Sequence, residues 1–204
     1  CHVGEIVAVA VASLAGAPLP ILPLQILYLN IVTDVFPALA VGVGEGDPAI
    51  MERPPRDPEE PILTGGHWAA VGGYGVAIAV PVLWALSLGL GRLGYEQPQA
   101  VSISFLTLGF ASLWHVFNVR DATAGFLVND VTGNPFVWGA LALCVGLLVA
   151  AVYVPGLAGV LRVVAPDRTG WLLILGLSLV PWAAGQIVLS VIGRMRRQGG
   201  MHGA

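Results

Sequence analysis

Long apolar runs alternate with short polar stretches along the whole chain. A helix that crosses a bilayer needs ~20 mostly apolar residues, and six runs approach or reach that length. The pattern predicts an all-α fold, a polytopic membrane helix bundle of six transmembrane helices that forms a single membrane domain over residues 1–204. The six expected helices cover residues 1–17, 21–42, 67–90, 101–118, 136–154 and 171–192.

The connections between these runs indicate how the chain crosses the membrane. Residues 43–66 carry five prolines and eight charged side chains, so we expect a semi-rigid loop in water, and residues 155–169 are expected to turn. Arginines favour the cytoplasmic side, which places the 43–66 loop and both ends of the chain in the cytoplasm. We expect a plasma (inner) membrane location. Six arginines fall on that side and three on the other: Arg53, Arg56, Arg120, Arg194, Arg196 and Arg197 against Arg92, Arg162 and Arg168.

Composition agrees with a membrane protein and excludes some partners. The chain is 56% hydrophobic and only 10% charged, which fits a bundle in contact with a lipid bilayer. It contains no lysine and has a net charge of −3, so we expect no nucleic-acid partner. The two cysteines, Cys1 and Cys144, have neither disulfide nor metal spacing and are interpreted as packing residues.

Asp34 is the residue in the second run that most needs an explanation. A carboxylate at this depth costs at least ~2.5–3.5 kcal/mol, so it requires a partner or a function. On a helix Asn30, Thr33 and Asp34 share one face, which lines up three oxygen-bearing side chains. Pro37 removes the donor for the Thr33 carbonyl and is expected to kink or open the helix beside Asp34. The combination predicts a site for a hard cation.

Glu5 is expected at the same depth as Asp34. Counted from the outer turn, Glu5 lies about 18 Å and Asp34 about 20 Å into the membrane. His2 and Ser112 fall at similar depths and are further candidate ligands, although His2 also suits a helix end and Ser112 suits helix packing. Because neighbouring segments often pack together, the two acids are expected to face one another. They could hold a Ca²⁺-like ion, share a proton in a relay, or form a buried pair without transport.

Five short motifs stand out in the first part of the chain: Val3-Gly4-Glu5, Pro23-Leu24-Gln25-Ile26-Leu27, Asn30-Ile31-Val32-Thr33-Asp34, Pro37-Ala38-Leu39-Ala40 and Asp47–Arg56. Together they resemble the carboxy-terminal membrane domain of P-type cation-transporting ATPases, with the calcium-pump-like branch as the nearest group. The resemblance covers essentially the whole chain, from the fifth to the tenth membrane helix of such pumps, and its most specific part is the Met-x-Arg-Pro-Pro-Arg sequence.

The resemblance implies a function and a set of ligands. Glu5 resembles the cation-binding acid of the fifth helix of such pumps, and Asn30, Thr33 and Asp34 resemble the ligands of the sixth. His2 stands where these pumps commonly have Asn, and Ser112 where they have Glu or Gln. The implied cargo is Ca²⁺ or a related divalent cation such as Mn²⁺.

The chain resembles only the carboxy-terminal part of such a pump. It starts inside an apolar run without Met, and we expect it to be a fragment. The implied partner is the amino-terminal part of the same pump, with the first four helices and the actuator, phosphorylation and nucleotide domains. ATP and Mg²⁺ would act only through those domains, and the fragment itself should not hydrolyse ATP. Two alternatives are a secondary cation transporter or channel, and a non-catalytic membrane module.

Overall fold

The structure is a computed structural model that describes residues 2–43, 65–118 and 133–200, without the side chains of residues 189 and 191–200. Every element in these ranges is helical, so the predicted all-α membrane helix bundle is confirmed. Most of the expected 43–66 loop, and the polar stretch around Arg120, lie outside the described residues. The elements are α1 (His2–Leu14), α2 (Pro23–Leu29), the π-helix η1 (Asn30–Val35), α3 (Phe36–Gly42), α4 (Gly65–Gly91), α5 (Gln97–His115), the 3₁₀-helix η3 (Val116–Asn118), α6 (Pro135–Tyr153), α7 (Pro155–Leu161) and α8 (Arg168–Gly200).

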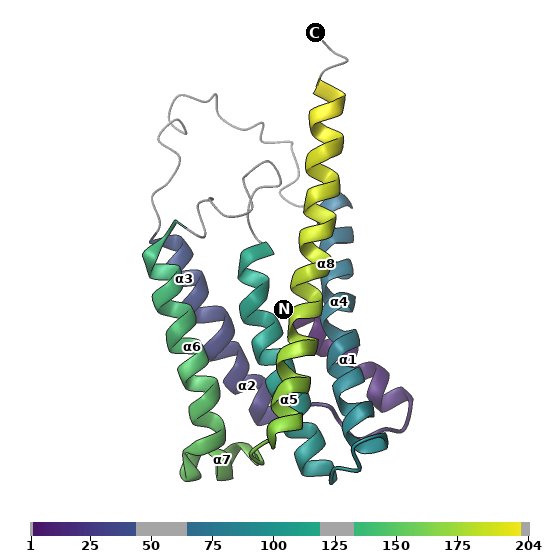
Figure 1. Ribbon diagram of the computed structural model, residues 1–204, viewed down its shortest axis with the longest axis vertical. Coiled ribbons are helices and arrows are strands. Elements are labelled where there is room, and N and C mark those ends of the chain that lie inside the picture. The colour runs from purple at the N-terminus through teal and green to yellow at the C-terminus, as the bar shows by residue number, and fades with distance from the viewer. Residues whose placement is uncertain (1, 44–64, 119–132, 201–204) are drawn as a thin grey trace.

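Helix α5 is the centre of the bundle (Figure 1). It packs against α4, α6, α8 and η1, while α3 and η1 lie along α6 on one side and α1 lies along α4 on the other. In its most apolar 18-residue window 78% of the residues are buried, against 22–39% in the other four long spans. The outer helices therefore expose many of their apolar side chains, whereas α5 is surrounded by protein.

Within the described residues, five helical segments are long and apolar enough to cross a bilayer. They are residues 23–42, 65–91, 97–118, 135–153 and 168–188. The first expected helix is present as α1, but its 13 residues extend only about 20 Å, less than the ~30 Å hydrocarbon core. His2 and Glu5, two of the candidate ligands, lie in the first turn of α1.

Two helical stretches differ from the sequence expectations. Residues 155–161 form the short helix α7, which starts at Pro155 and ends at Arg162 in the left-handed conformation (φ 53°). α8 continues to Gly200 instead of ending near residue 192. The apolar run marks where the membrane ends, but Arg, Met and Gln are good helix formers, so the helix itself does not stop there.

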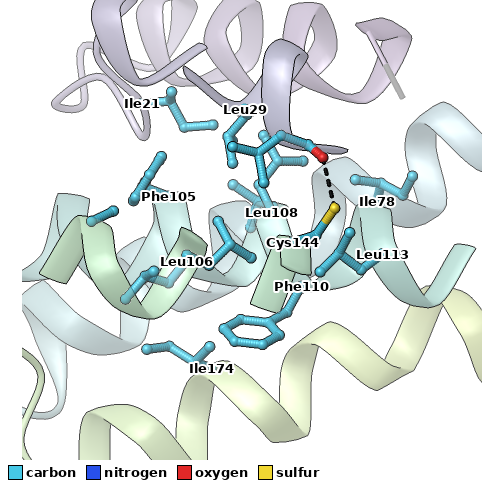
Figure 2. Packing of buried hydrophobic residues seen from close by; sticks show 14 of the residues in the cluster. Ile21, Leu29, Ile78, Phe105, Leu106, Leu108, Phe110, Leu113, Cys144 and Ile174 are labelled. Carbon is cyan, nitrogen blue, oxygen red and sulfur yellow. Dashed lines mark hydrogen bonds between the residues drawn. The ribbon is translucent and has the colours of Figure 1, made fainter. Parts of the chain in front are cut away.

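The buried core combines side chains from all parts of the bundle. Phe105, Leu106 and Leu108 of α5 meet Leu29 and Ile21 from the second segment and Ile174 from α8 (Figure 2). Three hydroxyl groups of α5 donate their hydrogen bonds within the helix. Each donates to the carbonyl four residues earlier in the chain, and they are those of Ser102 (2.7 Å), Ser104 (3.1 Å) and Thr107 (2.8 Å).

Helices α1 and α4 cross at two glycines. A Cβ on Gly75 would lie 2.5 Å from Cγ1 of Val3, and a Cβ on Gly4 would lie 3.0 Å from Cγ2 of Ile78. Small residues allow helix backbones to approach this closely in membranes. The crossing fixes α1, and with it Glu5, against α4.

Candidate cation site

The helix opening expected beside Asp34 takes the form of a π-helix, Asn30–Val35, between α2 and α3. Such single-turn π segments are rare and occur often at functional sites. Pro37 explains its position, because it cannot donate a backbone hydrogen bond to the preceding turn. Thr33 contributes as well: its hydroxyl donates to the Leu29 carbonyl at 2.9 Å, a contact that bends helices.

The three predicted ligands of the second segment all lie on the π-helix, and two of them are in contact. Thr33 is buried, with its hydroxyl oxygen 3.4 Å from Oδ1 of Asp34. Asn30 carries a buried side-chain oxygen, Oδ1, that has no hydrogen-bond partner. A buried oxygen of this kind destabilises the folded protein by about 1–3 kcal/mol unless a partner binds it, and a cation is a suitable partner.

His2 joins the two acids that the sequence places at the same depth. Its Nε2 lies 3.0 Å from Oδ2 of Asp34, and its Nδ1 lies 3.8 Å from Oε2 of Glu5. Glu5 is buried, Asp34 keeps 32% of its side chain exposed, and His2 is 58% exposed. α1 packs mainly on α4, and His2 links Glu5 of this helix to Asp34 of the second segment. The imidazole stands between the carboxylates.

The predicted ligands do not by themselves form a complete metal site. Among the described residues, no three His, Cys, Asp or Glu side chains are arranged to hold a metal ion. Ser112 is buried in α5, and the ion pairs of His2 connect only Glu5 and Asp34. An ion such as Ca²⁺ prefers six to eight oxygens, so further ligands have to join those of Asn30, Thr33 and Asp34.

Hydrogen bonds that the sequence does not predict connect α6 to the helix that carries the site, residues 23–42, hereafter the site helix. The Cys144 thiol donates to the Val32 carbonyl at 2.9 Å, and Nδ2 of Asn134 donates to the Ala40 carbonyl at 2.9 Å. From the other direction, the Tyr28 hydroxyl donates to the Leu147 carbonyl at 2.7 Å. Of these three residues, only Asn134 lies in a recognisable sequence pattern, that of a helix N-cap: it precedes Pro135, and its side chain accepts a hydrogen bond from Phe136 N–H at the start of α6.

Comparison with known proteins identifies this bundle. The model of the family described as "Cation transporting ATPase, C-terminus" matches residues 18–191, which include the whole site helix. The chain belongs to this family. The match begins after α1, so His2 and Glu5 precede the part of the cation transporting ATPase domain that the family model covers.

Calcium-transporting ATPases are among the similar proteins. This cation transporting ATPase domain is 34% identical over 180 residues to the calcium-transporting ATPase of Bacillus subtilis, covering 88% of this chain and 20% of that protein. It is 30% identical over 203 residues to calcium-transporting ATPase 1 of Bacillus cereus, covering 92% and 23%. A calcium-transporting ATPase of Listeria monocytogenes is 32% identical over 143 residues, covering 70% and 16%. The chain spans about a fifth of the length of these relatives.

Proposed function

We propose that this chain is the ion-binding and translocating membrane portion of an ATP-driven cation pump that transports Ca²⁺. The observation that carries the proposal is the π-helix Asn30–Val35, which presents Asn30, Thr33 and Asp34 with an unpartnered Asn30 oxygen. The calcium-transporting relatives support the choice of cation. ATP and Mg²⁺ would be bound by other parts of the same pump, which would also supply the remaining oxygen ligands.

The same proposal includes the surroundings of the domain. The apolar outer helices support insertion in a lipid bilayer, and the arginine distribution supports an orientation with both ends of the chain in the cytoplasm. The proposed location is the plasma (inner) membrane. Residues 43–66 would then lie on the cytoplasmic side, where by family resemblance they would contact the phosphorylation domain. Cation binding at Asp34 would be communicated to that domain through the site helix.

Asp34→Asn in the full-length pump tests the assignment. The substitution keeps the shape and removes the charge, so it should abolish Ca²⁺-dependent phosphorylation from ATP while the protein remains folded. Asp167→Asn, the same change at an acid outside the membrane spans, is the matched control and should keep phosphorylation. Normal Ca²⁺ transport by Asp34→Asn would show that the site assignment is wrong.

His2 supports a second part of the proposal, that each cycle carries one divalent cation. An imidazole 3.0 Å from Asp34 takes the place of a hard oxygen ligand between the two acids. We therefore expect one bound Ca²⁺ per pump, held around Asn30 and Asp34, with Mn²⁺ as the second candidate because it tolerates nitrogen ligands better.

Equilibrium binding of radiolabelled Ca²⁺ to the full-length protein, before and after His2→Asn, measures this stoichiometry. The amide restores an oxygen, so the variant should bind additional Ca²⁺ or bind it more tightly. Two tightly bound Ca²⁺ ions in the unmodified protein, unchanged by the substitution, would contradict the proposal.

A further inference from the structure

Three hydrogen bonds fasten the site helix to α6 along its length. Tyr28 bonds before the π-helix, Cys144 bonds at the π-helix, and Asn134 bonds near the end of α3. They connect residues that are 94 to 119 positions apart in the chain. The apolar packing of α6 against α3 and η1 fills the space between these bonds.

The middle bond has a particular partner, the Val32 carbonyl. In a π-helix a carbonyl accepts from the residue five positions later, which for Val32 is Pro37. Proline has no N–H, so in this register the Val32 carbonyl has no donor in its own helix. In an α-helix Pro37 would leave the Thr33 carbonyl without a donor, as expected from the sequence. In the π register the carbonyl without a donor is that of Val32.

Cys144 supplies the donor that Pro37 lacks. The dashed line in Figure 2 joins its sulfur to the carbonyl oxygen of the facing helix, at 2.9 Å. Cys144 and the Val32 residue are 0% and 1% exposed, so water has no access to either group. An unsatisfied carbonyl in a membrane interior is costly, and the thiol removes that cost only while the π register persists.

We propose that Cys144 is a positioning residue for the cation site: its thiol holds the π-helical register of Asn30–Val35 and thereby the orientation of the candidate ligands. The inference rests on the proposed function of that site. In an α-helix each turn closes with one residue fewer, so a change to the α register rotates Asp34 relative to Asn30. The thiol stabilises the arrangement in which both face the site.

Cys144→Ala, Cys144→Ser and Tyr28→Phe in the full-length pump separate positioning from general packing. Cys144→Ala removes the donor, Cys144→Ser keeps a donor, and Tyr28→Phe removes a bond to α6 outside the π-helix. The readouts are the equilibrium affinity for radiolabelled Ca²⁺ and the thermal unfolding midpoint. Cys144→Ala and Tyr28→Phe each remove one interhelical hydrogen bond, so the two substitutions should lower the unfolding midpoint by similar amounts.

The affinities should differ. Cys144→Ala should bind Ca²⁺ between about 3-fold and about 20-fold more weakly, the range expected for loss of one interhelical hydrogen bond in a membrane protein. Cys144→Ser should restore most of the affinity, and Tyr28→Phe should leave it unchanged. Three results would each overturn the inference: unchanged Ca²⁺ affinity in Cys144→Ala, equal affinity losses in Cys144→Ala and Tyr28→Phe, or equal affinity losses in Cys144→Ala and Cys144→Ser.

If Cys144→Ala does not fold, Cys144→Ser is compared with Tyr28→Phe. A Ca²⁺ affinity of Cys144→Ser near that of the unmodified protein supports the role of the donor, and a loss of affinity overturns it. Absence of Ca²⁺ binding in the unmodified protein would instead refute the proposed function.

Discussion

Asp167 stabilises the connection that leads into α8. Its Oδ1 accepts hydrogen bonds from the Tyr95 hydroxyl at 2.6 Å and from the Gly170 N–H at 2.8 Å. The Tyr95 hydrogen bond, followed by that of Gly170, lowers the pKa of the Asp167 carboxyl below its usual value, and the same contact raises the pKa of Tyr95. The ionised carboxylate therefore ties the α4–α5 connection to the start of α8.

Asp167→Asn should lower the thermal stability of the pump at neutral pH, because the amide oxygen is a weaker acceptor than a carboxylate. A carboxyl whose pKa is lower in the folded than in the unfolded state adds stability above its unfolded pKa. That contribution is lost as the pH falls through the folded pKa. The difference in midpoint between the two proteins should therefore shrink below about pH 4.

Thermal scans of both proteins across pH measure this difference. A difference that stays constant down to the acid limit would show that the charge of Asp167 has no part in it. Tyr95→Phe is the matched variant, because it removes the hydrogen-bond partner of Asp167. In a protein that carries Tyr95→Phe, Asp167→Asn should change the unfolding midpoint less.

At the scale of single residues, the sequence predicts which oxygen-bearing side chains lie on the site helix better than it predicts the residues around them. The spacing of Asn30, Thr33 and Asp34 was sufficient to place them together, because residues of one short helical segment have few alternatives. Cys144 could not be found in this way, since its partner is a backbone carbonyl 112 residues away and any residue type supplies a carbonyl. The bridging position of His2 depends on how α1 is held by α4, which the sequence pattern does not specify.

Among the elements, the opened site helix was predictable and its hydrogen-bond register was not. A proline in an apolar run predicts a break in the helix, but the break can take the form of a kink, a bulge or a π-helix. The end of α8 was missed for a different reason. Hydropathy reports the membrane boundary, and a helix can continue beyond that boundary in water.

The glycine crossing of α1 and α4 gives a prediction for an element pair. Gly75→Ala should destabilise the protein by about 1–3 kcal/mol, because its Cβ would meet Val3 in a buried contact with little room to adjust. Gly72→Ala is the control on the same helix, since nothing lies within 4 Å of a Cβ there. Alanine stabilises a helix more than glycine does, so Gly72→Ala should be neutral or slightly stabilising.

Thermal unfolding of the two full-length variants side by side measures the effect. Equal midpoints for Gly75→Ala and Gly72→Ala would mean that α1 and α4 are not closely packed in the intact pump. Because α1 carries both His2 and Glu5, Gly75→Ala should also displace them from Asp34, and a reduced Ca²⁺ affinity is expected alongside the lower midpoint.

At the scale of the whole molecule, the proposed orientation can be tested with two added cysteines. Asp57→Cys lies in the expected cytoplasmic loop, outside the described residues, and Glu96→Cys lies in the connection before α5. In sealed cells a membrane-impermeant thiol reagent should label Glu96→Cys, and it should label Asp57→Cys only after the membrane is permeabilised. Labelling of Asp57→Cys in intact cells would reverse the topology.

The enclosed position of α5 has a consequence for how the protein is made. Its Ser102, Ser104 and Thr107 hydroxyls bond within the helix, so the newly synthesised segment can enter lipid before any neighbour arrives. Once the bundle closes, protein replaces the lipid around it. Biogenesis should therefore pass through a stage in which α5 is inserted but still accessible to lipid-soluble probes, and this accessibility should disappear when α6 and α8, which are synthesised later, take their places.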